Sequence, residues 1–174
     1  IKDKITVFFS LLGPLIVILV FLLFLKNIQV DAVLGYLGKI GIHTRGTNLK
    51  KEITKLVLND MFGGVVATSI ITVSFATASK VVDDKISGVS RLYMASPIKS
   101  SVLTGSYILA SFFTSFVINL AVYFVSMIVL AATGAFYMTA LDVFTSIALI
   151  FVGVMSASTI FIVLVEGLTK TTQV

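Results

Sequence analysis

Four apolar stretches, each about as long as a lipid bilayer is thick, constrain this chain more than any other feature. The first, Ile5 to Leu25, contains no charged residue. As an α-helix it would span roughly 31 Å, which matches the hydrocarbon core of a membrane. The others predict helices over residues 58–79, 102–132 and 142–165. The sequence therefore predicts an all-α integral membrane protein with four transmembrane helices.

The composition supports a membrane protein and excludes several other classes. Hydrophobic residues make up 57% of the 174 residues and charged residues only 12%, whereas a soluble domain has about 25% charged residues. A disordered tail and a cytosolic enzyme are therefore excluded. The chain has no cysteine, so thiolate metal sites and cysteine nucleophiles are excluded as well. We assign the net charge of +5 to contacts with membrane lipid and not with nucleic acid.

Two longer segments connect the predicted helices. We expect residues 26–57 to form an extracytoplasmic loop and residues 80–101 a cytoplasmic segment. With the N-terminus inside, the inner segments would carry seven basic residues and the outer segments six. The positive-inside rule therefore does not decide the orientation.

The segment between the second and third helices has an amphipathic pattern. Val82, Ile86, Val89 and Tyr93 recur at helical spacing, which predicts a short helix with one apolar face. Pro97 should end that helix, and Ser100 or Ser101 should cap the next one. Such a helix lies on the membrane surface or docks a cytoplasmic partner, and the pattern leaves both alternatives open.

Three short motifs follow one another around this segment. They are Asp84-Lys85-Ile86-Ser87-Gly88, Ser96-Pro97-Ile98-Lys99 and Ser106-Tyr107. The opening of the chain adds Lys2-Asp3-Lys4, which is followed by an apolar stretch containing Pro14-Leu15. In these motifs, over roughly residues 1–170, the chain resembles the permease subunits of ABC-2 type transporters.

The resemblance implies more than the hydropathy pattern does. Such permeases have six membrane helices and a cytoplasmic N-terminus, and they form homo- or heterodimers that work with a separate ATP-hydrolysing subunit. We therefore expect this sequence to be part of a longer polypeptide that continues at both ends, with two further membrane helices. The expected function is export of a hydrophobic or amphipathic substrate across a prokaryotic cytoplasmic membrane.

We expect ATP and magnesium to bind to the partner ATPase, so this chain would bind no cofactor and would not be an enzyme. The sequence contains no Gly-x-x-x-x-Gly-Lys-(Ser/Thr) phosphate loop, which is consistent with ATP binding to another subunit. Within the cytoplasmic segment we expect the residues that couple the permease to the ATPase. They are Asp84, Lys85, Gly88, Arg91, Ser96 and Pro97.

Each coupling residue has an expected role. Asp84, Lys85 and Arg91 would make polar contacts with the partner or the membrane surface. Gly88 would allow close approach of the partner, and Pro97 would set the bend into the third helix.

Uncharged polar residues recur at helical spacing in the second and third helices. They are Thr68, Thr72, Ser111, Ser115 and Asn119. They are candidates for a translocation surface, but Ser, Thr and Asn also hydrogen-bond between membrane helices or to the preceding turn. Asp60 and Asp142 should lie at the N-terminal ends of the second and fourth helices, where the helix dipole favours negative charge.

Two rival functions need no ATPase. One is a non-transporting four-helix membrane protein, such as an assembly factor or a sensor. The other is a proton-coupled antiporter, which the sequence disfavours because no carboxylate falls at a predicted helix centre. A neighbouring gene for a phosphate-loop ATPase would favour the permease over both.

Overall fold

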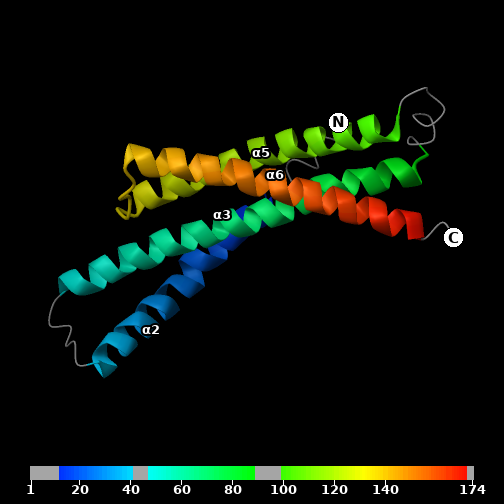
Figure 1. Cartoon of the computed structure of the whole chain (residues 1–174). Helices are drawn as coiled ribbons and strands as arrows, with labels where there is room; N and C mark the ends of the chain where they lie inside the picture. Colours follow the sequence, from blue (N-terminus) through cyan, green and yellow to red (C-terminus); the bar gives the residue numbers. More distant parts are fainter. Residues whose placement is uncertain (1–11, 41–46, 89–98, 172–174) are drawn as a thin grey trace.

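The computed structural model describes residues 12–40, 47–88 and 99–171, and these ranges are all-helical (Figure 1). The first helix runs from Leu12 to Lys39. It contains a π-helical stretch, η1, and continues as α2. The elements are η1 (Phe21–Leu25), α2 (Lys26–Lys39), α3 (Thr47–Ile86), α5 (Ser100–Ala132) and α6 (Ala140–Thr171).

Four helices in the described part of the chain are long and apolar enough to cross a membrane, as predicted. The longest is α3, with 40 residues. At about 1.5 Å per residue it is roughly 60 Å long, about twice the thickness of the hydrocarbon core. The helix therefore extends well beyond the bilayer.

The charge-free parts of the helices lie side by side. Ile18 and Phe21 of the first helix belong to the same buried cluster as Phe62 and Val65 of α3. Deeper along α3, Ser69 hydrogen-bonds to Asn119 of α5. The neighbouring Ile70 lies against Gly153 of α6. Because these contacts pair apolar segments at matching heights, the four helices form one slab without charged residues.

The helix α3 is central to the fold. It packs against α2 near its own start and against α5 and α6 along the rest of its length (Figure 1). The short turn between α5 and α6 lies near the first part of α3, because the carbonyl of Ala135 accepts a hydrogen bond from Asn59. The bundle therefore has two distinct ends, one with this turn and one with the end of α3 and the start of α5.

The expected loop over residues 26–57 is largely helical. The first helix continues to Lys39, and α3 already begins at Thr47. Val30 of α2 is buried against Ile53 and Val57 of α3, so the two helices form an antiparallel hairpin that projects beyond the slab. The sequence left the fold of this connection open, and its charged residues, which keep a helix out of lipid, do not stop it from being a helix.

The second connecting segment also differs from expectation. Val82 and Ile86 lie at the end of α3, and Gly88 has a φ of 77°, which interrupts the predicted continuous helix. Residues 89–98 lie outside the described residues. The expected serine cap is absent, because Lys99 is the N-cap of α5 and makes no side-chain cap hydrogen bond.

Two acidic residues were predicted at helix starts, and the structure confirms the position of one of them. Asp142 lies in the first turn of α6, where its carboxylate accepts a hydrogen bond from the backbone N–H of Thr139 at 2.8 Å. Asp60 lies in the interior of α3, because this helix starts thirteen residues earlier than Asp60. It is exposed just outside the charge-free part of the helix.

Candidate coupling and translocation sites

Two of the motif residues contact each other at one end of the bundle. The hydroxyl of Tyr107, on α5, donates a hydrogen bond to Oδ2 of Asp84, on α3, at 2.9 Å. Both residues are partly buried. The contact ties the last turns of α3 to the first turns of α5, directly beside the segment that joins them.

Gly88 follows this contact in a left-handed backbone conformation, with a φ of 77°. Residues other than glycine rarely adopt this backbone conformation, so any other residue would strain the turn. A Cβ at this position would meet no described atom within 4 Å. Glycine is therefore needed here for its backbone angle and not for crowding by the described residues.

The other expected coupling residues are described only in part. The backbone of Lys85 belongs to the last turn of α3, and its side chain is not among those described. Arg91, Ser96 and Pro97 lie outside the described residues. The structure thus places Asp84 and Gly88 at the end of α3.

The five candidate translocation residues fall into two groups. Thr68 and Thr72 are exposed on α3 within the charge-free slab. Each donates its hydroxyl hydrogen to a carbonyl of its own helix, at 2.9 Å for Thr68 to Gly64 and 3.0 Å for Thr72 to Thr68. These two threonines face away from the bundle described here.

The second group lies buried between α3 and α5. Oγ1 of Thr77 is 2.7 Å from Oγ of Ser111 and 2.8 Å from Oγ of Ser115. Because Thr77 donates its own hydrogen to the carbonyl of Ser74 at 3.0 Å, we assign both serines as donors to Thr77. This arrangement satisfies all three hydroxyl groups.

Asn119, one helical turn further along α5, extends this set of hydrogen bonds, which we call the polar seam. Its side-chain oxygen accepts a hydrogen bond from Ser69 at 2.6 Å, and its amide nitrogen donates to the carbonyl of Ser115 at 2.9 Å. Asn119 and Ser115 are fully buried. Ser111, Ser115 and Asn119 are therefore positioned as contacts between helices, which is the packing alternative considered for them.

The interface between α3 and α6 has a different character. Ser74 and Ser158 are fully buried, and neither hydroxyl has a hydrogen-bond partner among the residues that the structure describes. Ile70 packs in one cluster with Val154, and Ala78 packs in another with Ile162. Ser74 lies one helical turn from Ile70 and from Ala78, and Ser158 lies one turn from Val154 and from Ile162. The two serines therefore lie at the same height of the interface.

A cavity of about 290 Å³ lies between α3, α5 and α6. Its walls are mostly apolar, with Phe62, Ile70 and Ile150 among them. Four uncharged polar residues also line it. They are Asn59, Tyr123, Ser126 and Ser146. Its described lining contains no charged residue, so it suits an uncharged and largely apolar molecule.

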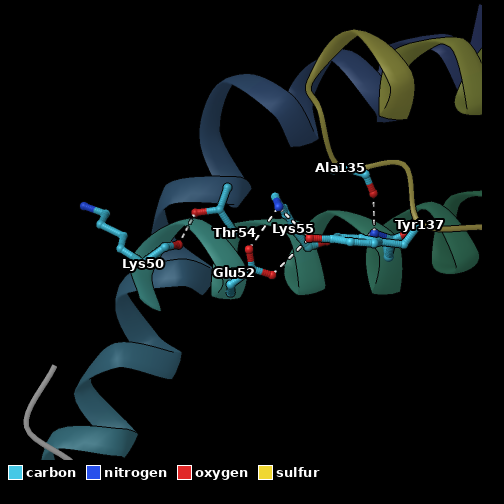
Figure 2. Close-up of polar contacts among 7 residues, drawn as sticks. Lys50, Glu52, Thr54, Lys55, Ala135 and Tyr137 are labelled. Carbon is cyan, nitrogen blue, oxygen red and sulfur yellow. Dashed lines mark hydrogen bonds and ion pairs between the residues drawn. The ribbon is translucent and has the colours of Figure 1, made fainter. Parts of the chain in front are cut away.

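A polar cluster lies on the hairpin side of the bundle, outside the charge-free slab (Figure 2). Lys55 donates hydrogen bonds to Glu52, at 2.9 Å, and to the hydroxyl of Tyr137, which in turn donates to Glu52 at 3.1 Å. The Lys55 ammonium and the Tyr137 hydroxyl lower the pKa of Glu52 below its ordinary value. The Tyr137 hydroxyl and the Glu52 carboxylate raise the pKa of Lys55.

The two polar contacts mark the two faces of the slab. Lys55 and Asp84 are separated by 29 positions on α3, or about 43 Å along the helix. This length matches a bilayer that includes its headgroup regions, about 40–45 Å. Tyr137 and Tyr107 then lie at the two interfaces, where tyrosine is enriched in membrane proteins.

No family model, no curated protein and no solved structure matches this sequence. In the described ranges, no group of three or more His, Cys, Asp or Glu residues is arranged to hold a metal ion. The resemblance to ABC-2 permeases therefore remains a prediction from the sequence motifs.

Several features of these sites are not evident from the sequence. The Tyr137 cluster joins residues 82 and 85 positions apart, and no spacing rule links them. Ser158 stands in an apolar stretch that contains other small residues, so nothing distinguishes it beforehand. The pairing of Asp84 with Tyr107 had a signal, because both belong to the motifs that carry the resemblance.

Proposed function

We propose that this chain is the membrane-spanning part of an ABC-2 type permease. It would export an uncharged apolar or amphipathic substrate, powered by ATP hydrolysis on a separate cytoplasmic subunit. The observation that carries the proposal is the hydrogen bond from Tyr107 to Asp84. It joins two of the three motifs behind the resemblance, at the one end of the bundle where a partner could push on both α3 and α5.

The proposed mechanism uses α3 as a lever. Closure of the ATPase subunits would push on residues 80–101, of which Asp84 and Gly88 are described at the end of α3. The Tyr107 contact and the polar seam join α3 to α5, so the two helices would tilt together. Because α3 continues into the hairpin with α2, the same tilt would reach the opposite membrane face.

The candidate translocation residues have two roles in this proposal. Thr68 and Thr72 are exposed within the slab, so they are available to a second permease copy and to substrate between the two copies. Ser111, Ser115 and Asn119 would support that surface from behind, by holding α5 against α3.

Co-purification of the full-length protein with its cytoplasmic ATPase, followed by transport and ATPase assays in lipid vesicles, tests the proposal. Gly88→Leu forces a side chain into a left-handed turn and should abolish substrate-stimulated ATP hydrolysis and export. Gly105→Leu is the matched control, because Gly105 lies in α5 with no described atom within 4 Å of its Cβ position. This variant should keep both activities.

Two outcomes would contradict the proposal. If Gly88→Leu and Gly105→Leu behave alike, the turn after α3 does not couple the subunits. If no ATPase co-purifies with the full-length protein and export is absent, the non-transporting alternative, an assembly factor or sensor, is favoured.

A further inference from the structure

The cavity between α3, α5 and α6 has an unusual hydrogen-bonding character, because its polar groups have already used their donors. Both amide hydrogens of Asn59 go to backbone carbonyls, those of Lys55 at 3.0 Å and Ala135 at 2.8 Å. Ser126 donates to the carbonyl of Val122 at 2.8 Å, and Ser146 to that of Asp142 at 2.7 Å. Tyr123, the fourth polar residue of the lining, donates its hydroxyl hydrogen to Sδ of Met138 at 3.8 Å. What these four groups still offer is acceptor capacity on oxygen.

The polar groups gather at one end of the cavity. Asn59 is hydrogen-bonded to the α5–α6 turn, and Ser146 lies in the second turn of α6. Ile70, at the other end, is about three helical turns further along α3 and lies against Gly153. The cavity is therefore amphipathic, with acceptors near the membrane interface and apolar walls toward the middle of the slab.

The size of the cavity limits what it can hold. A water molecule or a methylene group occupies about 30 Å³ in a liquid. The volume of about 290 Å³ therefore accommodates roughly ten non-hydrogen atoms. A single saturated chain of that length fits, with one polar group at the interface end.

We propose that this cavity is a binding site for one uncharged amphipathic molecule that donates a hydrogen bond. Its hydroxyl or amide N–H would lie at Asn59, Ser126 and Ser146, and its hydrocarbon body would extend toward Ile70. A charged head group is disfavoured because no described lining residue carries a charge. The inference requires only that the helices span a bilayer, so it holds for a permease and for a non-transporting membrane protein.

Photolabelling of the full chain in lipid nanodiscs tests the site. The probe is 1-heptanol with a diazirine at its apolar end, which matches the size of the cavity, and labelled residues are identified by mass spectrometry. Labelling should saturate at Ile70 and Ile150, which line the cavity. It should rise linearly at Val152, which is exposed on α6 and reports probe dissolved in the lipid.

Two adjacent glycines provide a matched pair of variants. Gly63 and Gly64 both have open space at their Cβ positions, but only Gly63 lines the cavity. Gly63→Leu should reduce saturable labelling about tenfold by filling the space, and Gly64→Leu should leave it unchanged. Equal loss in both variants, or no saturable labelling in the original chain, would overturn the site.

A second probe tests the hydrogen-bonding part of the proposal. Hexyl methyl ether with the same diazirine has the same size as the alcohol, and it can accept a hydrogen bond but cannot donate one. The alcohol should bind about fivefold more tightly than the ether. The double variant Ser126→Ala and Ser146→Ala should reduce that preference. Equal binding of the two probes to the original chain would contradict the acceptor assignment.

Discussion

The two interfaces that α3 makes with α5 and α6 run along the same helix but use opposite chemistry. On the α5 side, Thr77, Ser111, Ser115 and Asn119 form a continuous set of hydrogen bonds. On the α6 side, contact is made by apolar residues and by the approach of Ile70 to Gly153, and the buried hydroxyls of Ser74 and Ser158 have no hydrogen-bond partner among the described residues.

This difference has a physical consequence. Hydrogen bonds are directional, so the α5 interface fixes both the rotation and the height of the two helices. Apolar packing depends on shape but has no preferred hydrogen-bond direction, so the packing of Ile70 on Gly153 tolerates small shifts of α6 along α3. The fold thus pairs a fixed interface with one that can slide, and in the proposed permease α3 and α5 would move as one body relative to α6.

The largest expected effect comes from crowding the α6 interface. A Cβ on Gly153 would already lie 3.2 Å from Cδ1 of Ile70, so Gly153→Leu must push α6 away. We expect the free energy of unfolding in mixed micelles to fall by about 2–3 kcal/mol. Gly64→Leu, which meets open space, serves as the control. Equal stability of both variants would show that close packing at Gly153 does not matter.

Breaking the α5 interface should have the next largest effect. Asn119→Ala removes the acceptor of Ser69 and the donor to Ser115, which should cost about 1–2 kcal/mol in unfolding free energy. Thr114→Ala is the matched control, because Thr114 is half-buried and its hydroxyl bonds to the carbonyl of Ala110 in its own helix. If the two variants lose the same unfolding free energy, the hydrogen bonds of Asn119 do not stabilise the α5 interface.

Serine-to-alanine substitutions test the two interfaces of α3 with the same chemical change. Ser115→Ala should lower the unfolding free energy by about 1 kcal/mol, because its hydroxyl bonds to Thr77. Ser74→Ala and Ser158→Ala should leave it unchanged or raise it by about 0.5 kcal/mol, since each removes a buried unpaired hydroxyl. A clear loss of stability in Ser74→Ala would show that its hydroxyl is bonded.

The smallest expected effect concerns the exposed cluster outside both interfaces. Tyr137→Phe removes the hydroxyl that Lys55 and Glu52 share but keeps the ring beneath the Lys55 ammonium. Stability should change little, because ion pairs and hydrogen bonds near solvent contribute little to folding. The pKa of Glu52 should rise toward its ordinary value, which carboxyl NMR titration measures. An unchanged pKa would exclude the hydroxyl as a cause.

The sequence predicted the number of membrane helices and most of their apolar limits, because length and lack of charge are local properties. It did not reveal the fold of residues 26–57, where Val30 packs on Ile53 in a helical hairpin that carries charged residues. It also does not distinguish the glycines, since Gly63 and Gly64 face open space whereas Gly153 contacts α3.

The sequence likewise did not reveal what the polar residues of α5 contact. The spacing of Ser111, Ser115 and Asn119 predicts one helix face but does not say whether that face meets substrate or another helix. That choice depends on the position of Thr77 and Ser69, on a helix more than 30 residues away.

The sequence alone determined that this protein has four stretches long and apolar enough to cross a membrane. Uninterrupted apolar stretches of this length have a lower free energy in a bilayer than in water, whatever their arrangement. The tertiary structure decided which hydroxyl groups are paired, which glycine makes a contact and where the acceptor-lined cavity lies. Those features arise from the rotation and relative height of packed helices, which depend on contacts between residues far apart in the chain.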